Sequence, residues 1–399
     1  MSILGLRQSL WAMTSVLKLR MSGHRRPSAL PVHADGVNVL IAPANSAGQG
    51  FAWARALERV RPGTVVTSMQ FVSEVEPYSF EVDQSVLRGF GAHSKAWQRA
   101  QFRAAIEYKA VLVESAMPPF GGMLRNDATQ QIEALRNEGV RVGLLFHGSD
   151  IRDPELHLAS EPLSYFAADP DFTLQMRNRV LRSRALINTV CAPLFVSTPD
   201  LLTELPSALW LPVVVDVEEW ASGTAPPLSD SAIPVVLHIP SSSVVKGTAL
   251  IEPVLRQLDK AGKIQYRSAS GIPHAQVRDL VRGADIVVDQ VRGGPYGVAA
   301  CEAMAAGRVV VAHVPDIVRS RVAELTGSEL PIVEAAPDTL IDVLEDLLED
   351  RATARRIAGE GTQFVRHWHD GRESGRVLAN WLDEGEAAET PTRAEIDGE

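Results

Sequence analysis

Residues 285–313 read DIVVDQVRGGPYGVAACEAMAAGRVVVAH, which predicts a buried strand, a glycine-bearing loop, a helix and a second strand. The helix is expected to begin near Val298. Three glycines stand in the loop before it: Gly293, Gly294 and Gly297. They leave little side-chain obstruction around the helix N-terminus, where free N–H groups and the positive end of the dipole favour phosphate. Glu302, one turn further on, can accept hydrogen bonds from ribose hydroxyls. The pattern therefore indicates a nucleoside diphosphate site.

Apolar runs alternate with helical patterns on both sides of this stretch. Helices are expected near residues 50–60, 94–108 and 127–138, and from Lys246, Pro273 and Val298. Strands are expected at residues 37–43, 64–71, 110–115, 140–147, 185–190, 194–198, 234–240, 264–269, 285–290 and 307–313. Such alternation is typical of parallel sheets with helices on both faces. The sequence therefore predicts an α/β fold of two Rossmann-like, doubly wound domains that face each other across a cleft.

Changes in composition divide the chain into six segments. Gly, Ser and Pro accumulate where hydrophobic periodicity stops, which marks a linker, and acidic residues gather at the C-terminus. We expect a basic amphipathic segment (1–36), a first α/β domain (37–216), the linker (217–234), a second α/β domain (235–370), a helix that crosses back to the first domain (371–387) and an acidic disordered tail (388–399).

The composition limits the class of partner. The net charge of −10 argues against a nucleic-acid partner, which needs a basic face. Cys191 and Cys301 stand in apolar surroundings and match no metal-ligand spacing, so we expect two buried free thiols in a reducing cytoplasm. A membrane-spanning helix needs about 18 or more apolar residues, and the sequence has no such run.

The first 34 residues carry basic side chains and no acidic one. Arg7, Lys18 and Arg20 stand among apolar residues, a pattern typical of a basic amphipathic helix that binds an anionic membrane surface. Two other interpretations stay open: a helix that packs on the protein itself, and a frayed terminus. Peripheral contact with the inner face of the membrane through residues 1–34 is therefore one of three expectations.

A second phosphate signal follows the strand at 234–240. Residues 238–248 read HIPSSSVVKGT, in which three serines offer hydroxyl and N–H groups: Ser241, Ser242 and Ser243. Lys246 is expected to open the next helix, with Gly247 behind it. A lysine at a helix start opposes the helix dipole, which is understandable if the lysine faces a bound anion. The alternative is a capped helix with a lysine that faces solvent.

These motifs resemble those of a known family. HIPSSSVVKGT, SASGIPHAQVRDLVRGADIVVDQ and GGPYGVAACEAMAAGRVVVAH look like the nucleotide-sugar-binding half of GT-B glycosyltransferases, most like the large retaining family 4. The resemblance is strong over residues 235–320 and looser over 37–385. It implies that Lys246 binds the donor diphosphate and that Glu302 binds ribose. It also implies that the preceding loop offers backbone N–H groups, from Gly293, Gly294, Tyr296, Gly297 and Val298.

One departure concerns the donor sugar. The family often has two glutamates separated by seven residues, but Gly294 stands eight positions before Glu302. The carboxylate that would contact the sugar is therefore missing from this loop. Asp289 and Gln290 are the polar groups that remain at the strand end, and either is a candidate for this contact.

The first half adds two motifs. PANSAGQGFAWARAL, residues 43–57, is a strand-to-helix turn with Gly48 and Gly50, comparable to the family's glycine-containing loop near the donor phosphate and acceptor. The string HGSD at 147–150 ends a strand, and in related transferases such a histidine contacts the donor sugar. The resemblance thus places His147 with Lys246 in a catalytic role, while a structural histidine is the alternative.

The resemblance implies transfer of a glycosyl group from a nucleoside diphosphate sugar to an acceptor hydroxyl, with retention and without a metal ion or bound cofactor. The acceptor class stays open between a carbohydrate, a lipid-linked molecule and a small metabolite. Two alternatives remain: a catalytically silent nucleotide-sugar-binding protein, and a nucleotide-sugar epimerase of the same fold. The sequence Asp169-Pro170-Asp171 matches a metal-binding DxD but is typical of a helix cap, and His367 and His369 do not share a helical face.

Overall fold

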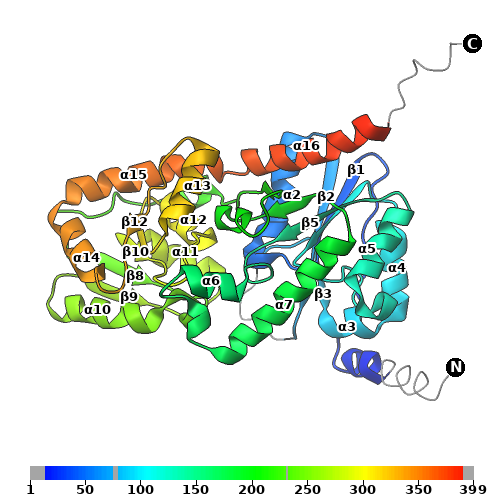
Figure 1. The fold of residues 1–399 in the computed structure, drawn as a ribbon, viewed down its shortest axis with the longest axis horizontal. Coiled ribbons are helices and arrows are strands. Elements are labelled where there is room, and N and C mark those ends of the chain that lie inside the picture. Colours follow the sequence, from blue (N-terminus) through cyan, green and yellow to red (C-terminus); the bar gives the residue numbers. More distant parts are fainter. Residues whose placement is uncertain (1–13, 75–79, 231, 390–399) are drawn as a thin grey trace, which may run out of the picture.

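The computed structural model describes residues 14–74, 80–230 and 232–389. Two lobes lie side by side, each built on one parallel sheet (Figure 1). The seven-stranded sheet of the N-terminal domain has the order β3-β2-β1-β4-β5-β6-β7, and the five-stranded sheet of the C-terminal domain has the order β12-β11-β10-β8-β9. The predicted class, α/β with two doubly wound Rossmann-like domains, is confirmed.

The N-terminal sheet contains β1 (Val37–Ala42), β2 (Thr64–Val72), β3 (Gln84–Leu87), β4 (Ala110–Glu114), β5 (Arg141–Phe146), β6 (Leu194–Val196) and β7 (Leu209–Trp210). The strand expected at 185–190 is wrong, because these residues end the long helix α7 (Pro170–Thr189). Val180, Ser183 and Leu186 are buried at helical spacing, which the apolar run alone does not reveal. Strands β3 and β7 were not expected, since they are short and lie at the sheet edges.

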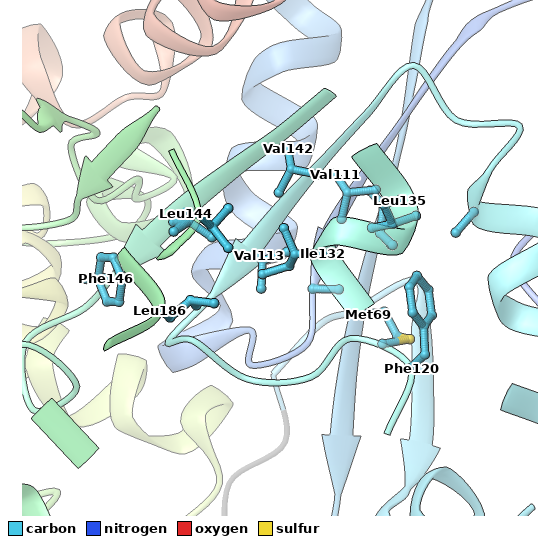
Figure 2. Packing of buried hydrophobic residues seen from close by; sticks show 14 of the residues in the cluster. Met69, Val111, Val113, Phe120, Ile132, Leu135, Val142, Leu144, Phe146 and Leu186 are labelled. Atoms are coloured by element: carbon cyan, nitrogen blue, oxygen red, sulfur yellow. The ribbon is translucent and has the colours of Figure 1, made fainter. Parts of the chain in front are cut away.

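Helices cover both faces of this sheet. They are α2 (Gln49–Val60), α3 (Arg88–His93), α4 (Lys95–Ala105), α5 (Ala128–Asn137), α6 (Pro154–Ser160) and α7. Figure 2 shows one face, where Val111 and Val113 of β4 pack with Ile132 of α5 and Leu186 of α7. On the other face Leu112 of β4 belongs to a cluster with α2. The continuous apolar strands of the sequence are therefore explained by burial on both sides.

The C-terminal sheet contains β8 (Val235–His238), β9 (Gln265–Ser268), β10 (Ile286–Val288), β11 (Val309–Ala312) and β12 (Val333–Glu334). Its helices are α9 (Ser243–Lys246), α10 (Thr248–Lys260), α11 (His274–Arg282), α12 (Val298–Ala305), α13 (Asp316–Thr326), α14 (Leu340–Glu349) and α15 (Arg351–Trp368). Alternate residues of β10 point to opposite faces, with Val287 in one cluster and Ile286 and Val288 in the other. The two faces are again both covered.

Two segments connect the lobes. The first is the predicted linker, which is more ordered than its composition suggests: it contains α8 (Val217–Ala221), and Val217, Trp220 and Leu228 are buried. The second is α16 (Arg372–Glu389), which follows α15 and lies on α2 of the N-terminal domain (Figure 1). Helix α16 continues through residues 388 and 389, where the tail was expected to begin, and the rest of that tail lies outside the described residues.

The N-terminal segment packs on the protein as far as it is described. Residues 14–21 are helical, and Leu19 joins the N-terminal core, where a Cβ on Gly89 would lie 2.7 Å from Leu19 Cδ1. Leu17 and Met21 are exposed on this segment. The basic Arg7 and its apolar neighbours lie outside the described residues.

Two further expectations can be compared with the structure. Across the part of the chain that the structure describes, none of the helices is both long and apolar enough to cross a membrane. Cys301 is buried as expected, but Cys191 is exposed, so that expectation was wrong. Cys191 stands just after α7, in a connection to β6 where the apolar neighbours alone do not enforce burial.

Candidate functional site

Each sheet has a switch point where the strand order reverses. Strand β8 has β9 on one side and β10 on the other, and β1 has β2 and β4 on its two sides. Ligands of open parallel sheets bind beyond the carboxyl ends of the strands at such points. The loops that follow β8, β10, β1 and β4 are therefore where a site is expected.

The N-terminus of α12 follows β10 and offers free N–H groups. Helix α12 begins at Val298, its N-cap Gly297 has no side chain to satisfy them, and the first turn of a helix leaves N–H groups without intrahelical partners. A Cβ on Gly297 would meet no atom within 4 Å, so the space beside this turn is open. The free N–H groups and the open space that the predicted phosphate seat requires are both present.

Glu302 lies one turn inside α12 and is 6 % exposed. Burial raises the pKa of Glu302, a shift that the hydrogen bond from His274 opposes. His274 Nε2 lies 2.7 Å from Glu302 Oε1, and this hydrogen bond raises the pKa of His274. A carboxylate offers about four acceptor positions, so the contact with His274 leaves others open to a ligand. Sequence reasoning missed His274, which lies inside the quoted stretch SASGIPHAQVRDLVRGADIVVDQ at the start of α11 but was given no role there.

The loop between β10 and α12 needs its glycines for close packing. Gly293 has φ +95° and Gly294 has φ +77°, which disfavour other residues. A Cβ on Gly293 would lie 2.8 Å from the ring of Tyr165, and one on Gly294 would lie 2.6 Å from Pro315 Cδ. Gln290 ties the start of this loop to the end of β11, because its Nε2 donates to His313 O at 2.6 Å.

Tyr296 belongs to the core rather than to the cleft. Its side chain is buried, and its hydroxyl lies 3.3 Å from Nε2 of the buried His369. Only the backbone of Tyr296 is therefore available for the predicted role.

Lys246 lies opposite this loop and pairs with Asp289. Its Nζ is 2.5 Å from Asp289 Oδ1, and the two side chains are 17 % and 5 % exposed. Lys246 ends the one-turn helix α9 and Gly247 follows with φ +77°, so the expectation that Lys246 opens the next helix was wrong. The lysine charge is thus favourable with respect to α9, because cations stabilise helix C-termini. Lys246 is therefore connected to the candidate site by its ion pair with Asp289, and not by an unfavourable helix dipole.

The serines before Lys246 are exposed: Ser241, Ser242 and Ser243. Ser242 is the N-cap of α9, where its Oγ accepts from Val245 N. Gly247 is required for close approach, since its Cβ would lie 2.9 Å from Val291 Cγ2. The loops after β8 and β10 are therefore in direct contact.

A buried carboxylate organises the loop after β1. Glu114, at the end of β4, is 0 % exposed and accepts from Ala44 N at 2.8 Å and from Asn45 N at 2.9 Å. Gly48, at the start of α2, has φ +74°. A Cβ on Gly50 would lie 3.1 Å from Asn45 Oδ1, so the glycine leaves room for this side chain. Glu114 was missed, although a carboxylate that ends a fully buried strand is a detectable signal.

His147 shares this carboxylate. Its Nε2 lies 3.1 Å from Glu114 Oε1, and its ring stacks on Trp53 with centroids 5.6 Å apart. Burial would lower the pKa of His147, but the hydrogen bond and charge of Glu114 outweigh it, and the pKa is raised. The rest of the motif is structural: Asp150 Oδ1 accepts from His147 N and Gly148 N.

A cavity of about 380 Å³ separates the two domains at this point. Its N-terminal wall includes Gly48 and Phe80, and its C-terminal wall includes Trp220, His274 and Glu302. The rings of Phe80 and His274 meet across it with centroids 4.9 Å apart. Of the predicted site residues, Gly48 and Glu302 line this cavity. Gly50, His147, Lys246, Asp289 and the residues from Gly293 to Val298 are not among those that line it.

Helix α6 and the turn after it close the cleft over the glycine loop. His157 Nε2 lies 3.1 Å from Gly293 O, and Glu161 Oε2 lies 3.2 Å from His313 Nε2. Glu161 Oε1 is also 4.0 Å from the place of a Cβ on Gly294. A carboxylate from the N-terminal domain therefore lies near the position where this loop lacks one.

The discounted metal motifs have structural roles. Asp169 caps α7 by accepting from Phe172 N at 3.0 Å. His369 is buried, its Nδ1 lies 2.8 Å from Val213 O, and burial lowers its pKa to about 4. Over the described residues, no group of three or more His, Cys, Asp or Glu side chains could hold a metal ion.

Comparisons with known proteins identify the fold. No family model matches the sequence, and a search of the curated proteins gives no match. Among solved structures, sucrose-phosphate synthase from Thermosynechococcus elongatus is similar with a TM-score of 0.59 and 15 % identity, covering 88 % of this chain and 99 % of that chain. HepE of Anabaena in complex with UDP and glucose has a TM-score of 0.56 and 14 % identity, covering 87 % and 99 %.

A third similar structure is an alpha-glucosyltransferase in complex with UDP and a 13-mer DNA, with a TM-score of 0.57, 10 % identity and coverage of 87 % and 99 %. All three are similar over both lobes rather than over one. The chain therefore has the GT-B fold.

Proposed function

We propose that this protein transfers a glycosyl group from a nucleoside diphosphate sugar to an acceptor hydroxyl, with retention of configuration and with no metal ion in the reaction. The observation that carries the proposal is the joint placement of three groups at the β8–β10 switch point. These are the open N-terminus of α12, the Lys246 ammonium and the buried Glu302 carboxylate. The complexes of similar fold that contain UDP support this assignment.

Each of the three groups binds a different part of the donor. The N–H groups of Val298 and its neighbours receive the diphosphate, and Glu302 receives the ribose hydroxyls. Lys246 has three N–H donors, of which one is engaged by Asp289, so others can reach a phosphate oxygen. In the cavity between the domains, Gly48 lies opposite Glu302, so the nucleotide is enclosed from both sides.

The reaction follows from this placement. The bond between the anomeric carbon and the β-phosphate oxygen breaks, and a bond from the acceptor oxygen to the same carbon forms. The negative charge that develops on the leaving diphosphate is stabilised by Lys246 and the α12 N-terminus, which are already oriented. The acceptor proton passes to a leaving phosphate oxygen. Closure of the domains excludes water and limits donor hydrolysis.

Turnover of donor sugars tests this proposal. The protein is incubated with UDP-, GDP-, dTDP- and ADP-sugars in EDTA, and the released nucleoside diphosphate is measured. We expect release from one donor, with a loss of about tenfold or more in Lys246→Ala and Glu302→Ala, because hydrogen bonds to charged groups contribute about 1.5–3 kcal/mol. Unchanged release in both variants would remove the site assignment.

A silent nucleotide-sugar-binding protein is the second candidate, and two observations favour it. Position 294 is a glycine, and the acidic and basic groups of the site pair with one another, as Lys246 does with Asp289 and His274 with Glu302. Binding of a nucleotide without release from any donor sugar would select this candidate.

A further inference from the structure

A second cavity, of about 960 Å³, lies at the other switch point, in the N-terminal domain. Its floor is the chain after β1 and β4, including Ala44 and Ser115, and α5 and α7 form its walls. The loop after β1 separates it from the cavity between the domains: Ser46 lines the larger cavity, and Gly48 lines the smaller one. A molecule in the larger cavity therefore lies just across this loop from the proposed donor site.

The larger cavity is basic in a protein that is acidic overall. Four arginines line it: Arg88, Arg125, Arg179 and Arg182. Among the described residues of its lining, Asp127 is the single carboxylate, and it caps α5 by accepting from Gln130 N at 3.1 Å. The chain as a whole has a net charge of −10, so this concentration of positive charge is local.

The cavity arginines lack acidic partners. Within the described residues, no carboxylate lies within 4.0 Å of the guanidinium groups of these four arginines. Arg179 donates a hydrogen bond to Ser149 Oγ at 3.5 Å. Other arginines of the same helix are paired, such as Arg177 with Glu155 at 2.9 Å. On helix α7, an arginine outside the cavity is thus paired with a carboxylate, whereas Arg179 and Arg182, which line the cavity, are free to bind an anion.

One polar side chain supports a ligand at this place. Ser183 also lines the cavity, is 0 % exposed, and its hydroxyl has no hydrogen-bond partner in the described structure. It stands four residues after Arg179 and one after Arg182, so Arg179 and Ser183 share a face of α7. Buried polar groups are normally hydrogen-bonded, and a bound anion would supply the missing acceptor.

We propose that this cavity binds the acceptor and that the acceptor carries a phosphate group, held by Arg179 and Arg182. The guanidinium fork matches phosphate oxygens in bidentate geometry. A phosphate with two negative charges suits several unpaired guanidinium groups, whereas a carboxylate needs only one. The acceptor role rests on the proposed function, but the binding of phosphate does not. Soluble sugar phosphates and phospholipid head groups share this chemistry.

Three matched probes test the phosphate site. Glucose 6-phosphate, glucuronate and glucose differ in charge at one carbon, and each is added to the full chain at constant ionic strength while the unfolding midpoint is measured. We expect glucose 6-phosphate to raise the midpoint more than glucuronate, and glucose to leave it unchanged. The double variant Arg179→Gln/Arg182→Gln is expected to bind glucose 6-phosphate at least about tenfold more weakly. The control Arg177→Gln, on the same helix, is expected to behave as the wild type.

Flotation with vesicles of phosphatidic acid distinguishes the lipid source. Flotation that depends on Arg179 and Arg182, without a response to glucose 6-phosphate, assigns the phosphate to a lipid head group, and the opposite result assigns it to a soluble acceptor. Equal responses to glucose and glucose 6-phosphate, or equal binding by the wild type and the double variant, would overturn the phosphate site. So would arginine-dependent binding of duplex DNA with no response to either phosphate probe.

Nucleotide binding, measured in the same samples, separates this inference from the proposed function. Retention of a nucleotide-induced shift by the double variant shows that it is folded. If the protein responds to nucleotides but not to the phosphate probes, only the proposed phosphate site is rejected. If the protein binds phosphate through these arginines but responds to no nucleotide, only the proposed function is rejected.

Discussion

Asp289 connects the charge of Lys246 to the proposed donor site. Their ion pair leaves a carboxylate beside the place where a diphosphate would lie. We predict that Asp289→Asn binds the nucleoside diphosphate about threefold to tenfold more tightly, because the change removes a like charge and frees Lys246. Titration calorimetry measures this, with the exposed Asp279→Asn as the control. Equal or weaker binding would show that Asp289 itself contributes to the site.

Glu114 holds two parts of the N-terminal domain together. It accepts from two N–H groups of the loop after β1 and pairs with His147. We predict that Glu114→Gln lowers the free energy of unfolding by about 1–3 kcal/mol, since an amide presents a donor where the site needs acceptors. Denaturant unfolding measures the change, and the exposed Glu107→Gln should leave it within about 0.5 kcal/mol. A neutral Glu114→Gln would show that the loop holds its shape without this carboxylate.

At the scale of elements, α16 is the structural tie between the lobes. Leu382 is 0 % exposed and belongs to the cluster that α2 forms with the N-terminal sheet. We predict that Leu382→Ala lowers the free energy of unfolding by about 2–5 kcal/mol, because it leaves a cavity under α16. The exposed Glu384→Ala is the control. A change below about 1 kcal/mol would mean that α16 contributes little to the N-terminal core.

The sequence was most informative where strands are long and buried on both faces. Strands β1, β2, β4 and β5 were expected within two residues of their observed limits. Edge strands such as β3 (QSVL) were not predicted, because a stretch of four residues that includes polar side chains shows no clear hydrophobic periodicity. The end of α7 was taken for a strand, since a short apolar run fits either structure.

The site could be predicted only where it depends on local chain geometry. The glycines before α12 and the position of Glu302 follow from loop and helix rules. The partners that come from elsewhere in the chain could not be predicted: Asp289 for Lys246, His274 for Glu302 and Glu161 near Gly294. The first two pairs join different loops of the C-terminal domain, and Glu161 comes from the N-terminal domain, so each depends on tertiary packing that no short pattern encodes.

At the scale of the whole molecule, the domains meet through an ion pair that titrates. His313 of the C-terminal domain contacts Glu161 of the N-terminal domain at 3.2 Å and Glu334 at 2.7 Å. The hydrogen bond with Glu161, with that of Glu334, raises the pKa of His313 to about 9. Because the folded-state pKa lies above the ordinary value of 6.5, this stabilisation is fully present below about pH 6.5. It is lost as the pH rises through about 9.

We therefore predict that the wild type loses more thermal stability than His313→Gln between pH 6.5 and pH 9.5. Unfolding midpoints of both proteins across this range give the measurement. The difference between the two curves isolates His313 from other groups that titrate there. Parallel curves would show that the contact between the domains does not depend on the histidine charge.

The proposed transfer requires a seat for the diphosphate beside Lys246 and the N-terminus of α12. The direct test is the unfolding midpoint of the full chain with UDP, GDP, dTDP or ADP in the presence of EDTA, for the wild type, Lys246→Ala and the control Lys263→Ala. Lys263 is half exposed and pairs with Glu345 far from the site. We predict that one nucleotide raises the midpoint of the wild type and Lys263→Ala, and that Lys246→Ala loses this shift. No shift with any nucleotide, or an equal shift in Lys246→Ala, would contradict the account.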